Sequence, residues 1–504
     1  MENRVNWYST SAVVLLMLLF VAQALPYFTY RWVEDESWYS GTAYTLLHEG
    51  QVRNAMFAER DLEARADTRP LAMPATLALT FATLGVGPAQ ARIPEFLSCL
   101  ALIPMVFWLG KLLGSPKVGV LAALLVCVDN MVFLASRTVR PEAYVSCFGT
   151  LAVLLYFLSR QRDSLPLAIL SGLSLGLSFN FHVNGYGIAL SIGVLLLLEL
   201  RLSTWRSKRA WALVLASIAT MIPFCLWLFG DPVRWQAFRA LYGRGSVLTL
   251  NDIVGFEMIR YSDLLGIGNQ KLRFVPFPIP LRFHIVLLIV ASLGWLAWKR
   301  RTLFWTLLTL LVPSLLLWPK EVNPTARFFV ILAPYFALAV ALAFDALDRP
   351  KWRPVVACWI ALVVVSEIAG NLLFLRQART ANYVACSRQL RSAVPADAHV
   401  YGAITFFMAL YDRPYYSWNR TPLDWAVDKL GVNYLILNDR VLVHGSGIGL
   451  DDWKEVREKA ENFARTNADL IAKVPDPFYG DLEIYRVRPA STAGRASPAL
   501  PARQ

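Results

Sequence analysis

Charge is scarce in this sequence. Only 17% of its 504 residues are Asp, Glu, Lys or Arg, whereas 56% are hydrophobic, and the mean hydropathy is +0.45. Soluble domains carry about 25% charged residues. The composition therefore excludes an ordinary soluble protein and predicts a polytopic membrane protein.

Cysteine is also scarce, and acidic residues are fewer than basic ones. The six cysteines show no paired spacing of the kind that binds zinc, and five of them lie in apolar segments, so we interpret them as small core residues. The net charge of +13 would suggest a nucleic-acid partner in a soluble chain. In a membrane protein, Lys and Arg concentrate in the cytoplasmic loops, which can account for a positive net charge.

Apolar runs recur along the first three quarters of the chain, each long enough to cross, or nearly cross, a hydrocarbon core of about 30 Å. They are residues 11–29, 94–113, 118–135, 143–158, 166–181, 185–200, 210–229, 283–298, 302–318, 327–347 and 354–374. We therefore predict an all-α bundle of about eleven spans.

The basic residues fix the orientation of these spans. With the N-terminus in the cytoplasm, Lys and Arg concentrate in the internal loops, for example at 206–209, 299–301 and 349–353. This positive-inside pattern accounts for much of the net charge without nucleic acid and predicts an inner (plasma) membrane protein. Counting 71–87 as a further span would invert every later loop, so we expect a juxtamembrane helix there.

Two segments leave alternatives open. The first apolar run ends in Ala22-Gln23-Ala24, which resembles a signal-peptide cleavage site, but cleavage there would not alter the later topology. Residues 230–282 contain Arg234, Trp235 and Arg239, which suit either an interfacial helix near a substrate or an amphipathic surface segment without a substrate role.

The C-terminal region differs in character. Strand patterns at 399–405, 432–438 and 482–487 alternate with helix patterns at 423–430 and 451–467. This alternation predicts a small external α/β domain. We thus expect a transmembrane domain over 1–375, the α/β domain over 376–488, and a disordered Ala/Pro/Ser/Arg tail over 489–504.

Unusual polar residues gather on the external side of this topology. They are Asp35, Glu36, Arg69, Arg137, Arg140, Glu142, His182, Asn184, Lys320, Glu321 and Arg327. Each alone has a structural explanation: a solvated loop for the acids at 34–36, an ion pair for Arg140 with Glu142, and an interfacial hydrogen bond for His182. Together they favour one water-facing cavity with carboxylates beside cations.

Such a cavity suits transfer of a sugar from a lipid phosphate. A carboxylate removes the proton of an attacking hydroxyl, while Arg and Lys hold the phosphate, which leaves as a stable anion without a general acid. One carboxylate is enough, whereas hydrolysis of a glycoside usually needs two.

Five short motifs carry a resemblance to the GT-C glycosyltransferases, in the branch of the protein O-mannosyltransferases and the lipid A aminoarabinose transferase. Over about residues 7–375, Asp35-Glu36-Ser-Trp-Tyr39 with Gly50, Arg69-Pro70, Arg92-Ile-Pro94, Arg140-Pro141-Glu142 and His182…Gly185 resemble its motifs in order. The sequence departs from the pattern at Arg69, where the branch has lysine, and at Thr68, where it often has an acid.

The resemblance implies roles for individual residues. Asp35 would be the catalytic base, and Glu36 would orient the acceptor or hold the loop. Arg69 and His182 would face the donor phosphate, and Glu142 would shape the cavity. Arg140 and Asn184 lie in the matching motifs, whereas Lys320 and Arg327 are added as substrate-binding residues on physical grounds only, because they are external cations.

The family implies a polyprenyl monophosphate sugar as donor, used with inversion, and a glycan, lipid or protein as acceptor. It also implies no metal in the chemistry, although a divalent ion is used by oligosaccharyltransferases. The rival interpretations are a lipid-linked sugar flippase, which would place charges near the midplane, and an inactive scaffold with the same fold. The sequence leaves the donor sugar, the acceptor and the oligomeric state open.

Overall fold

The computed structural model describes residues 2–57, 70–200, 206–242, 254–255, 258, 261–262, 282–317, 326–347, 349–418, 421–438 and 450–489. The chain forms two compact units. The first comprises residues 1–55 and 59–384, and the second comprises 56–58 and 385–504. The sequence-based boundary at 375–376 lies within the last long helix of the first unit.

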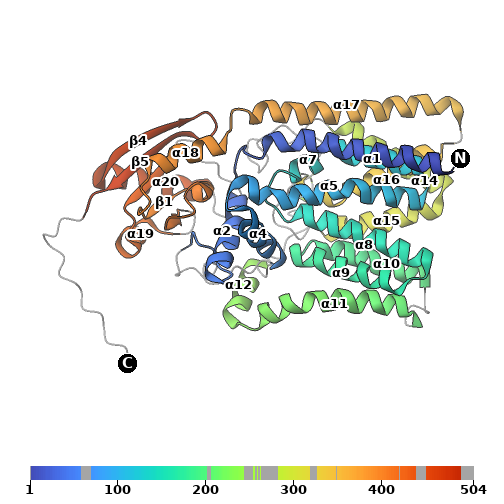
Figure 1. Cartoon of the computed structure of the whole chain (residues 1–504), viewed down its shortest axis with the longest axis horizontal. Coiled ribbons are helices and arrows are strands. Elements are labelled where there is room, and N and C mark those ends of the chain that lie inside the picture. The colour runs from blue at the N-terminus through green and yellow to red at the C-terminus, as the bar shows by residue number, and fades with distance from the viewer. Residues whose placement is uncertain are drawn as a thin grey trace. The chain divides into compact units, whose positions relative to one another are not determined.

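The first unit is a bundle of long helices (Figure 1). Its α-helices are α1 (Glu2–Ala24), α2 (Glu34–Glu49), α4 (Ala72–Leu84), α5 (Pro88–Leu113), α6 (Pro116–Val128), α7 (Asn130–Ala135), α8 (Glu142–Arg162), α9 (Leu165–Phe181), α10 (Gly185–Leu200), α11 (Lys208–Phe229), α12 (Pro232–Tyr242), α14 (Phe283–Lys299), α15 (Arg301–Leu317), α16 (Ala333–Asp345) and α17 (Arg353–Ala378). Its 3-10 helices are η1 (Leu25–Tyr27), η5 (Ala326–Ile331) and η6 (Pro350–Trp352).

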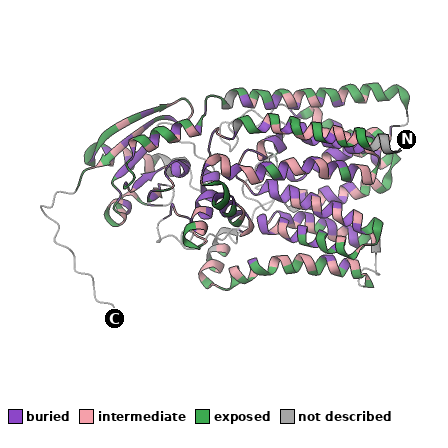
Figure 2. Cartoon of the chain, viewed as in Figure 1, coloured by how far each residue is buried: buried purple, intermediate pink, exposed green. Residues whose placement is uncertain are grey.

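Every apolar run predicted as a span contains a helix. In the described parts, five helices are long and apolar enough to cross a membrane, and seven further apolar helices are shorter. The peripheral helices α11 and α17 carry exposed residues along their outer faces (Figure 2), among them Leu226 and Val365, which are 69% and 62% exposed. Exposed leucine and valine on long helices are what lipid contact requires, so the chain is a multi-pass membrane protein.

Two segments refine the sequence-based expectations. The run 118–135 is not one helix, because Asp129 ends α6 and caps α7, where its carboxylate accepts hydrogen bonds from the amides of Met131 and Val132 (2.8 and 3.0 Å). The ambiguous run 71–87 contains the 13-residue α4, which packs against α2. A helix of that length is too short to span a bilayer without help.

Small residues bring α9 and α11 into close contact. A Cβ atom at Gly172 would lie 2.1 Å from the carbonyl oxygen of Leu213, and one at Gly176 would lie 2.6 Å from that of Ser217. Glycines four residues apart on one helix face allow two backbones to approach closely, which is a common basis of helix association in membranes.

The second unit contains a five-stranded sheet of order β2-β1-β3-β5-β4. Its strands are β1 (Val400–Gly402), β2 (Tyr415–Ser417), β3 (Tyr434–Asn438), β4 (Ala468–Asp476) and β5 (Gly480–Val487). Strands β2, β1 and β3 are parallel, and β5 is antiparallel to both β3 and β4. Its helical elements are α18 (Tyr383–Ala393, beginning at the end of the first unit), η7 (Ile404–Ala409), α19 (Leu423–Leu430) and α20 (Leu450–Asn467).

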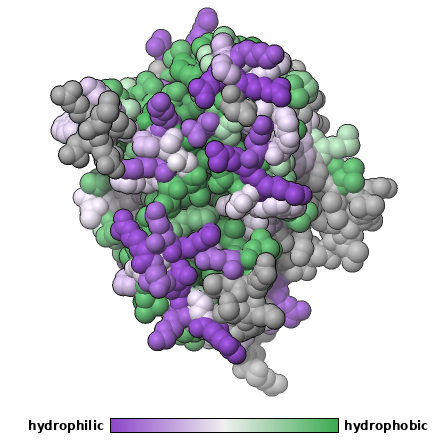
Figure 3. Space-filling model, turned by 90° about the vertical axis from the view of Figure 1, so that its right-hand side faces the viewer, coloured by the Kyte–Doolittle hydropathy of each residue, from purple (hydrophilic) through white to green (hydrophobic). Residues whose placement is uncertain are grey.

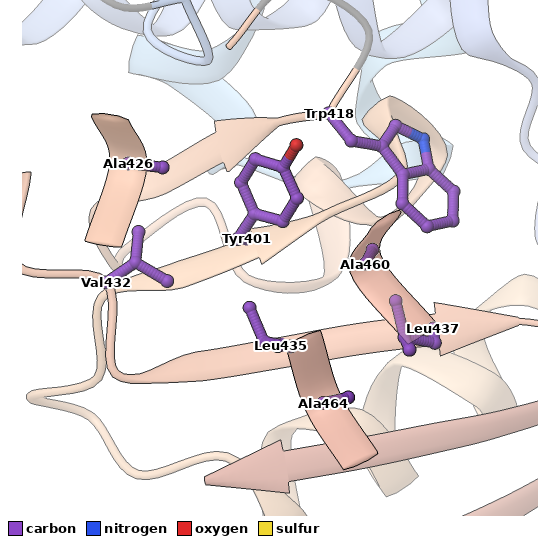
Figure 4. Packing of buried hydrophobic residues seen from close by; sticks show 8 residues of the cluster. All are labelled: Tyr401, Trp418, Ala426, Val432, Leu435, Leu437, Ala460 and Ala464. Atoms are coloured by element: carbon purple, nitrogen blue, oxygen red, sulfur yellow. The ribbon is translucent and has the colours of Figure 1, made fainter. Parts of the chain in front are cut away.

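Aromatic and aliphatic side chains form the core of this unit. Tyr401 from β1 and Leu435 from β3 pack with Trp418 and with Ala460 and Ala464 of α20 (Figure 4). The alternation of helices and strands confirms the predicted α/β character. The expected strand 399–405 is wrong beyond Gly402, because the chain turns into the 3-10 helix η7 at Ile404.

Candidate active site

The acidic triplet forms the first turn of α2. Val33 is extended, and the helix begins at Glu34, so all three carboxylates lie at the positive end of the helix dipole. The three side chains differ in surroundings: Glu34 and Glu36 are buried, whereas the Asp35 side chain keeps 24% of its surface exposed. The first turn of α2 thus places a partly exposed acid between two buried ones.

Glu36 is held by four hydrogen bonds. Arg92 of α5 donates from Nε and Nη2 to its two carboxylate oxygens at 2.8 and 2.9 Å, and the amides of Val33 and Val139 donate at 2.9 and 3.1 Å. Both charged side chains are fully buried. Arg92 also donates to the carbonyl oxygens of residues 28, 30 and 31. This pair therefore fixes α2, α5 and the loop before α8 to one another.

Asp35 faces Arg140. The Nη1 atom of Arg140 lies 2.5 Å from Oδ2 of Asp35, and its Nε lies 3.4 Å from Oε2 of Glu142. Burial lowers the pKa of Arg140, but the carboxylates of Asp35 and Glu142 outweigh that effect and hold the pKa above its ordinary value. Arg140 is therefore a cation shared by two acids, of which Asp35 is the more accessible to solvent.

His182 ends α9 near this group. The stacked rings of Tyr144 and Phe181, with centroids 4.2 Å apart, join the end of α9 to the first turn of α8, which begins at Glu142. The amide of Asn184 donates to Nδ1 of His182 at 3.1 Å, so a neutral ring carries its proton on Nε2. Asn184 is 2% exposed, and its own amide side chain has no hydrogen-bond partner in the described part of the structure.

The structure thus brings together four residues predicted from the sequence, namely Asp35, Glu36, Arg140 and Glu142, and places His182 and Asn184 on a neighbouring helix end. Arg69 and Lys320 lie outside the described residues. The backbone of Arg327 belongs to η5, but its side chain is outside the described part.

An apolar cavity lies behind η5. It measures about 260 Å³ and is lined by residues of α6, α14, α15, α16 and α17. Phe329 lines it, while the ring of the preceding residue, Phe328, faces His182 with centroids 6.4 Å apart. Two consecutive residues of η5 therefore separate the cavity from the His182 side of the bundle.

A polar network at one end of this cavity was not predicted. Arg282, at the start of α14, pairs with Asp129 (2.6 Å) and with Glu367 of α17 (3.2 Å). Glu367 also accepts a hydrogen bond from the amide of Asn130 (2.5 Å). An acid in the middle of the apolar run 354–374 was the available sequence signal, because such residues are costly in a bilayer and usually have a partner.

The comparisons with known proteins agree with this fold. Residues 68–227 match the family model for dolichyl-phosphate-mannose-protein mannosyltransferase. A search of curated protein sequences found no significant match.

Solved structures resemble the chain over most of its length. Apo ArnT from Cupriavidus metallidurans shares 11% identity over 95% of this chain and 98% of its own, with a TM-score of 0.62. ArnT bound to undecaprenyl phosphate shares 12% identity over 97% and 99%, with a TM-score of 0.60. The oligosaccharyltransferase AglB from Archaeoglobus fulgidus, in complex with an inhibitory peptide and a dolichol-phosphate, shares 11% identity over 86% and 69%, with a TM-score of 0.54. The family model thus matches residues 68–227 of the chain, and the chain shares its fold with the solved structures of ArnT and AglB.

Proposed function

We propose that the protein transfers a sugar from a polyprenyl monophosphate to a hydroxyl acceptor on the outer face of the inner (plasma) membrane. The observation that carries this proposal is the contrast between two adjacent acids. Glu36 accepts four hydrogen bonds inside the protein, whereas Asp35 is partly exposed and shares Arg140 with Glu142. Asp35 is therefore the acid of this turn that a substrate can reach.

Asp35 acts as the base in this mechanism. The acceptor oxygen attacks the anomeric carbon, its proton passes to Asp35, and the bond from that carbon to the phosphate oxygen breaks on the opposite side. The configuration inverts, and the polyprenyl phosphate leaves with the electron pair. A stable anionic leaving group needs no general acid, which fits a site where a cation accompanies the accessible carboxylate of Asp35.

Arg140 links donor binding to the basicity of Asp35. Its guanidinium stabilises the ionised form of Asp35 and so makes that carboxylate a weak base. The phosphate of an arriving donor is a strong competitor for the same guanidinium. We expect the donor to draw Arg140 away from Asp35, which then becomes basic only when the phosphate is present.

The remaining predicted residues complete the donor site. His182 would donate its Nε2 proton to phosphate, and Arg69, Lys320 and Arg327 are the further candidate phosphate contacts. Glu142 pairs with Nε of Arg140, whereas Asp35 pairs with Nη1, and Glu142 so shapes the site. The apolar cavity behind η5 is suited to an isoprenoid chain. The complexes of ArnT with undecaprenyl phosphate and of AglB with a dolichol-phosphate support a donor of this class.

The site does not fit a catalytic divalent cation. Asp35 and Glu142 both face Arg140, and Glu36 faces Arg92, so each of these carboxylates already has a guanidinium partner. In the described residues there is no group of three or more His, Cys, Asp or Glu side chains arranged to hold a metal. We propose that the chain's own residues perform the chemistry without a metal.

The positive-inside pattern supports a cytoplasmic N-terminus, with the site and the α/β unit on the outer side of the membrane.

The deciding experiment measures lipid-linked sugars and envelope glycans by mass spectrometry in cells with and without the gene, complemented by wild type, Asp35→Asn or Glu49→Gln. Glu49 is an exposed acid at the other end of α2 and serves as the control. Transfer predicts that a polyprenyl-phosphate sugar accumulates without the gene, that one glycan loses a residue, and that wild type and Glu49→Gln reverse both. Complementation by Asp35→Asn would instead favour a flippase.

A further inference from the structure

A second cavity lies at the other end of the bundle from Asp35. It measures about 320 Å³ and opens between the end of α14, the end of α16, and η6 with the first turns of α17. In Figure 1 these ends lie on the side of the N-terminus, whereas α2 and α4 lie at the opposite end of the same unit. The proposed donor chemistry does not involve this cavity.

The walls of this cavity are aromatic and fixed. Trp295 donates its indole proton to the carbonyl oxygen of Ala346 (3.3 Å), and Trp359 donates to that of His284 (3.0 Å). Both indole N–H groups are therefore satisfied within the protein, and the ring faces that line the cavity are apolar. Together with Phe344, Leu347 and neighbouring aliphatic side chains, they suit a hydrocarbon chain.

The cavity is accessible from the outer surface of the bundle. Trp352 lines it and is 47% exposed, and Val355 beside it on α17 is 52% exposed. Helix α17 packs only sparsely on α14, so a crevice remains between the two helices. A lipid chain can therefore enter sideways from the membrane.

The rim of the cavity is strongly basic. Segments 299–301 and 345–353 contain six Lys or Arg residues and two Asp residues. Arg349 lines the cavity itself, and its guanidinium lies 5.9 Å from the ring centroid of Trp298, while Nζ of Lys299 lies 4.7 Å from the same centroid. Asp345 accepts a hydrogen bond from Ser115 (3.4 Å). Figure 3 views this end, where hydrophilic side chains surround an apolar surface.

We propose that this cavity binds an acidic glycerophospholipid, with one acyl chain between Trp295 and Trp359 and the phosphate beside Arg349 and Lys299. Apolar walls alone would accept any lipid, whereas the excess of cations at the rim selects a headgroup with net negative charge. Basic pockets between helices commonly bind such headgroups, at about 1 kcal/mol per Lys or Arg near the surface. Trp298 and Trp352 lie where tryptophan is enriched, at the boundary between hydrocarbon and water.

Brominated lipids test this site directly, because bromine on an acyl chain quenches nearby tryptophan. The purified protein in detergent is titrated with dibrominated phosphatidylglycerol or dibrominated phosphatidylcholine. We expect a saturable phase of quenching with the acidic lipid that the neutral lipid lacks. Arg349→Gln should weaken binding of the acidic lipid about fivefold, measured as the lipid concentration that gives half of this saturable quenching. Arg162→Gln, which removes an exposed arginine at the end of α8, is the matched control and should not change it.

Two further variants separate the outcomes. Trp359→Phe removes an emitting ring from the cavity and should reduce the amplitude of the saturable phase without changing the lipid preference. Asp35→Asn should leave the amplitude of the saturable phase and the lipid preference unchanged, whether or not it abolishes transfer. Equal quenching by the two lipids would show an ordinary lipid contact and overturn the proposal. An undiminished preference for the acidic lipid in Arg349→Gln would overturn it as well.

Discussion

Arg92 and Glu36 lie 56 residues apart in the sequence, yet two hydrogen bonds of 2.8 and 2.9 Å join their fully buried side chains. The pair holds the first turn of α2 against α5, and Asp35 takes its position from that turn. A buried pair contributes little net stability, but removing one partner leaves an uncompensated charge. Arg92 therefore positions the proposed base without contacting it.

Replacing Arg92 by alanine should destabilise the protein by about 3–5 kcal/mol, because Glu36 would keep a buried charge without its partner. Thermal unfolding of the purified protein in detergent measures the loss. Arg53→Ala is the control, because Arg53 forms an exposed pair with Glu49 and its loss should cost about 1 kcal/mol or less. If Arg92→Ala unfolded at the wild-type temperature but lost activity, Arg92 would have a direct role in the reaction.

Replacing Asp35 by asparagine should lower the transfer rate by about 10²- to 10⁴-fold, which is the contribution of a general base. The amide keeps the shape of the side chain, so the protein should fold normally and still bind donor. Single-turnover transfer from a radiolabelled polyprenyl-phosphate sugar measures the rate, and Glu49→Gln provides the control. Near-normal transfer by Asp35→Asn would show that a group other than Asp35 is the base.

Replacing Arg140 by glutamine should change the pH dependence of transfer. In the free enzyme Arg140 favours the ionised form of Asp35, so its loss should raise the pKa of Asp35. The acidic limb of kcat/KM should then move to higher pH, since this parameter reports groups in the free enzyme. The donor KM should also rise, and Arg140→Lys should restore part of both effects. An unchanged acidic limb would show that Arg140 does not influence the ionisation of the base.

Removal of divalent metal should leave transfer unchanged, because Asp35, Glu36 and Glu142 already face Arg92 or Arg140. Treatment with EDTA followed by a transfer assay, with and without added Mn²⁺ or Mg²⁺, measures this. Loss of activity that an added ion restores would contradict the metal-independent mechanism.

The contact between α9 and α11 should depend on the absence of a side chain at Gly172. Gly172→Ala should destabilise the protein, because the new Cβ atom would lie 2.1 Å from a backbone oxygen. Gly193→Ala is the matched control, since a Cβ atom there would meet nothing within 4 Å and alanine favours a helix by about 1 kcal/mol. Melting temperatures that changed equally in both variants would show that the close approach contributes nothing.

The sequence predicted the helices of the bundle because an apolar run of sufficient length has few alternatives in a membrane. It also predicted that Asp35, Arg140 and Glu142 would meet, because alternating topology places their loops on one side. It did not predict the contacts of Glu36, since nothing in a local pattern shows which residue from another helix lies opposite. The break at Asp129 was missed because one acid hardly alters the hydropathy of its window.

In the α/β unit the long, regular patterns were found and the weak ones were missed. Helix α19 occupies the predicted residues 423–430, whose apolar side chains repeat at helical spacing. Strand β2 has only three residues, and β4 contains Asp469, Lys473 and Pro475 in place of a regular alternation. Pairing with β1 and β5 makes these segments strands, which is a property of the sheet and not of their own sequence.

The two buried ionic networks also imply an order of assembly during synthesis. Glu36 has its four hydrogen-bond donors once residue 139 has been made, so its buried carboxylate can be satisfied while most of the helices are still unsynthesised. Asp129, by contrast, must wait for Arg282, and Glu367 later joins the same cation. Until residue 282 has been made, the growing chain therefore carries the Asp129 carboxylate without this partner, and chains truncated before α14 should be targets for membrane quality control.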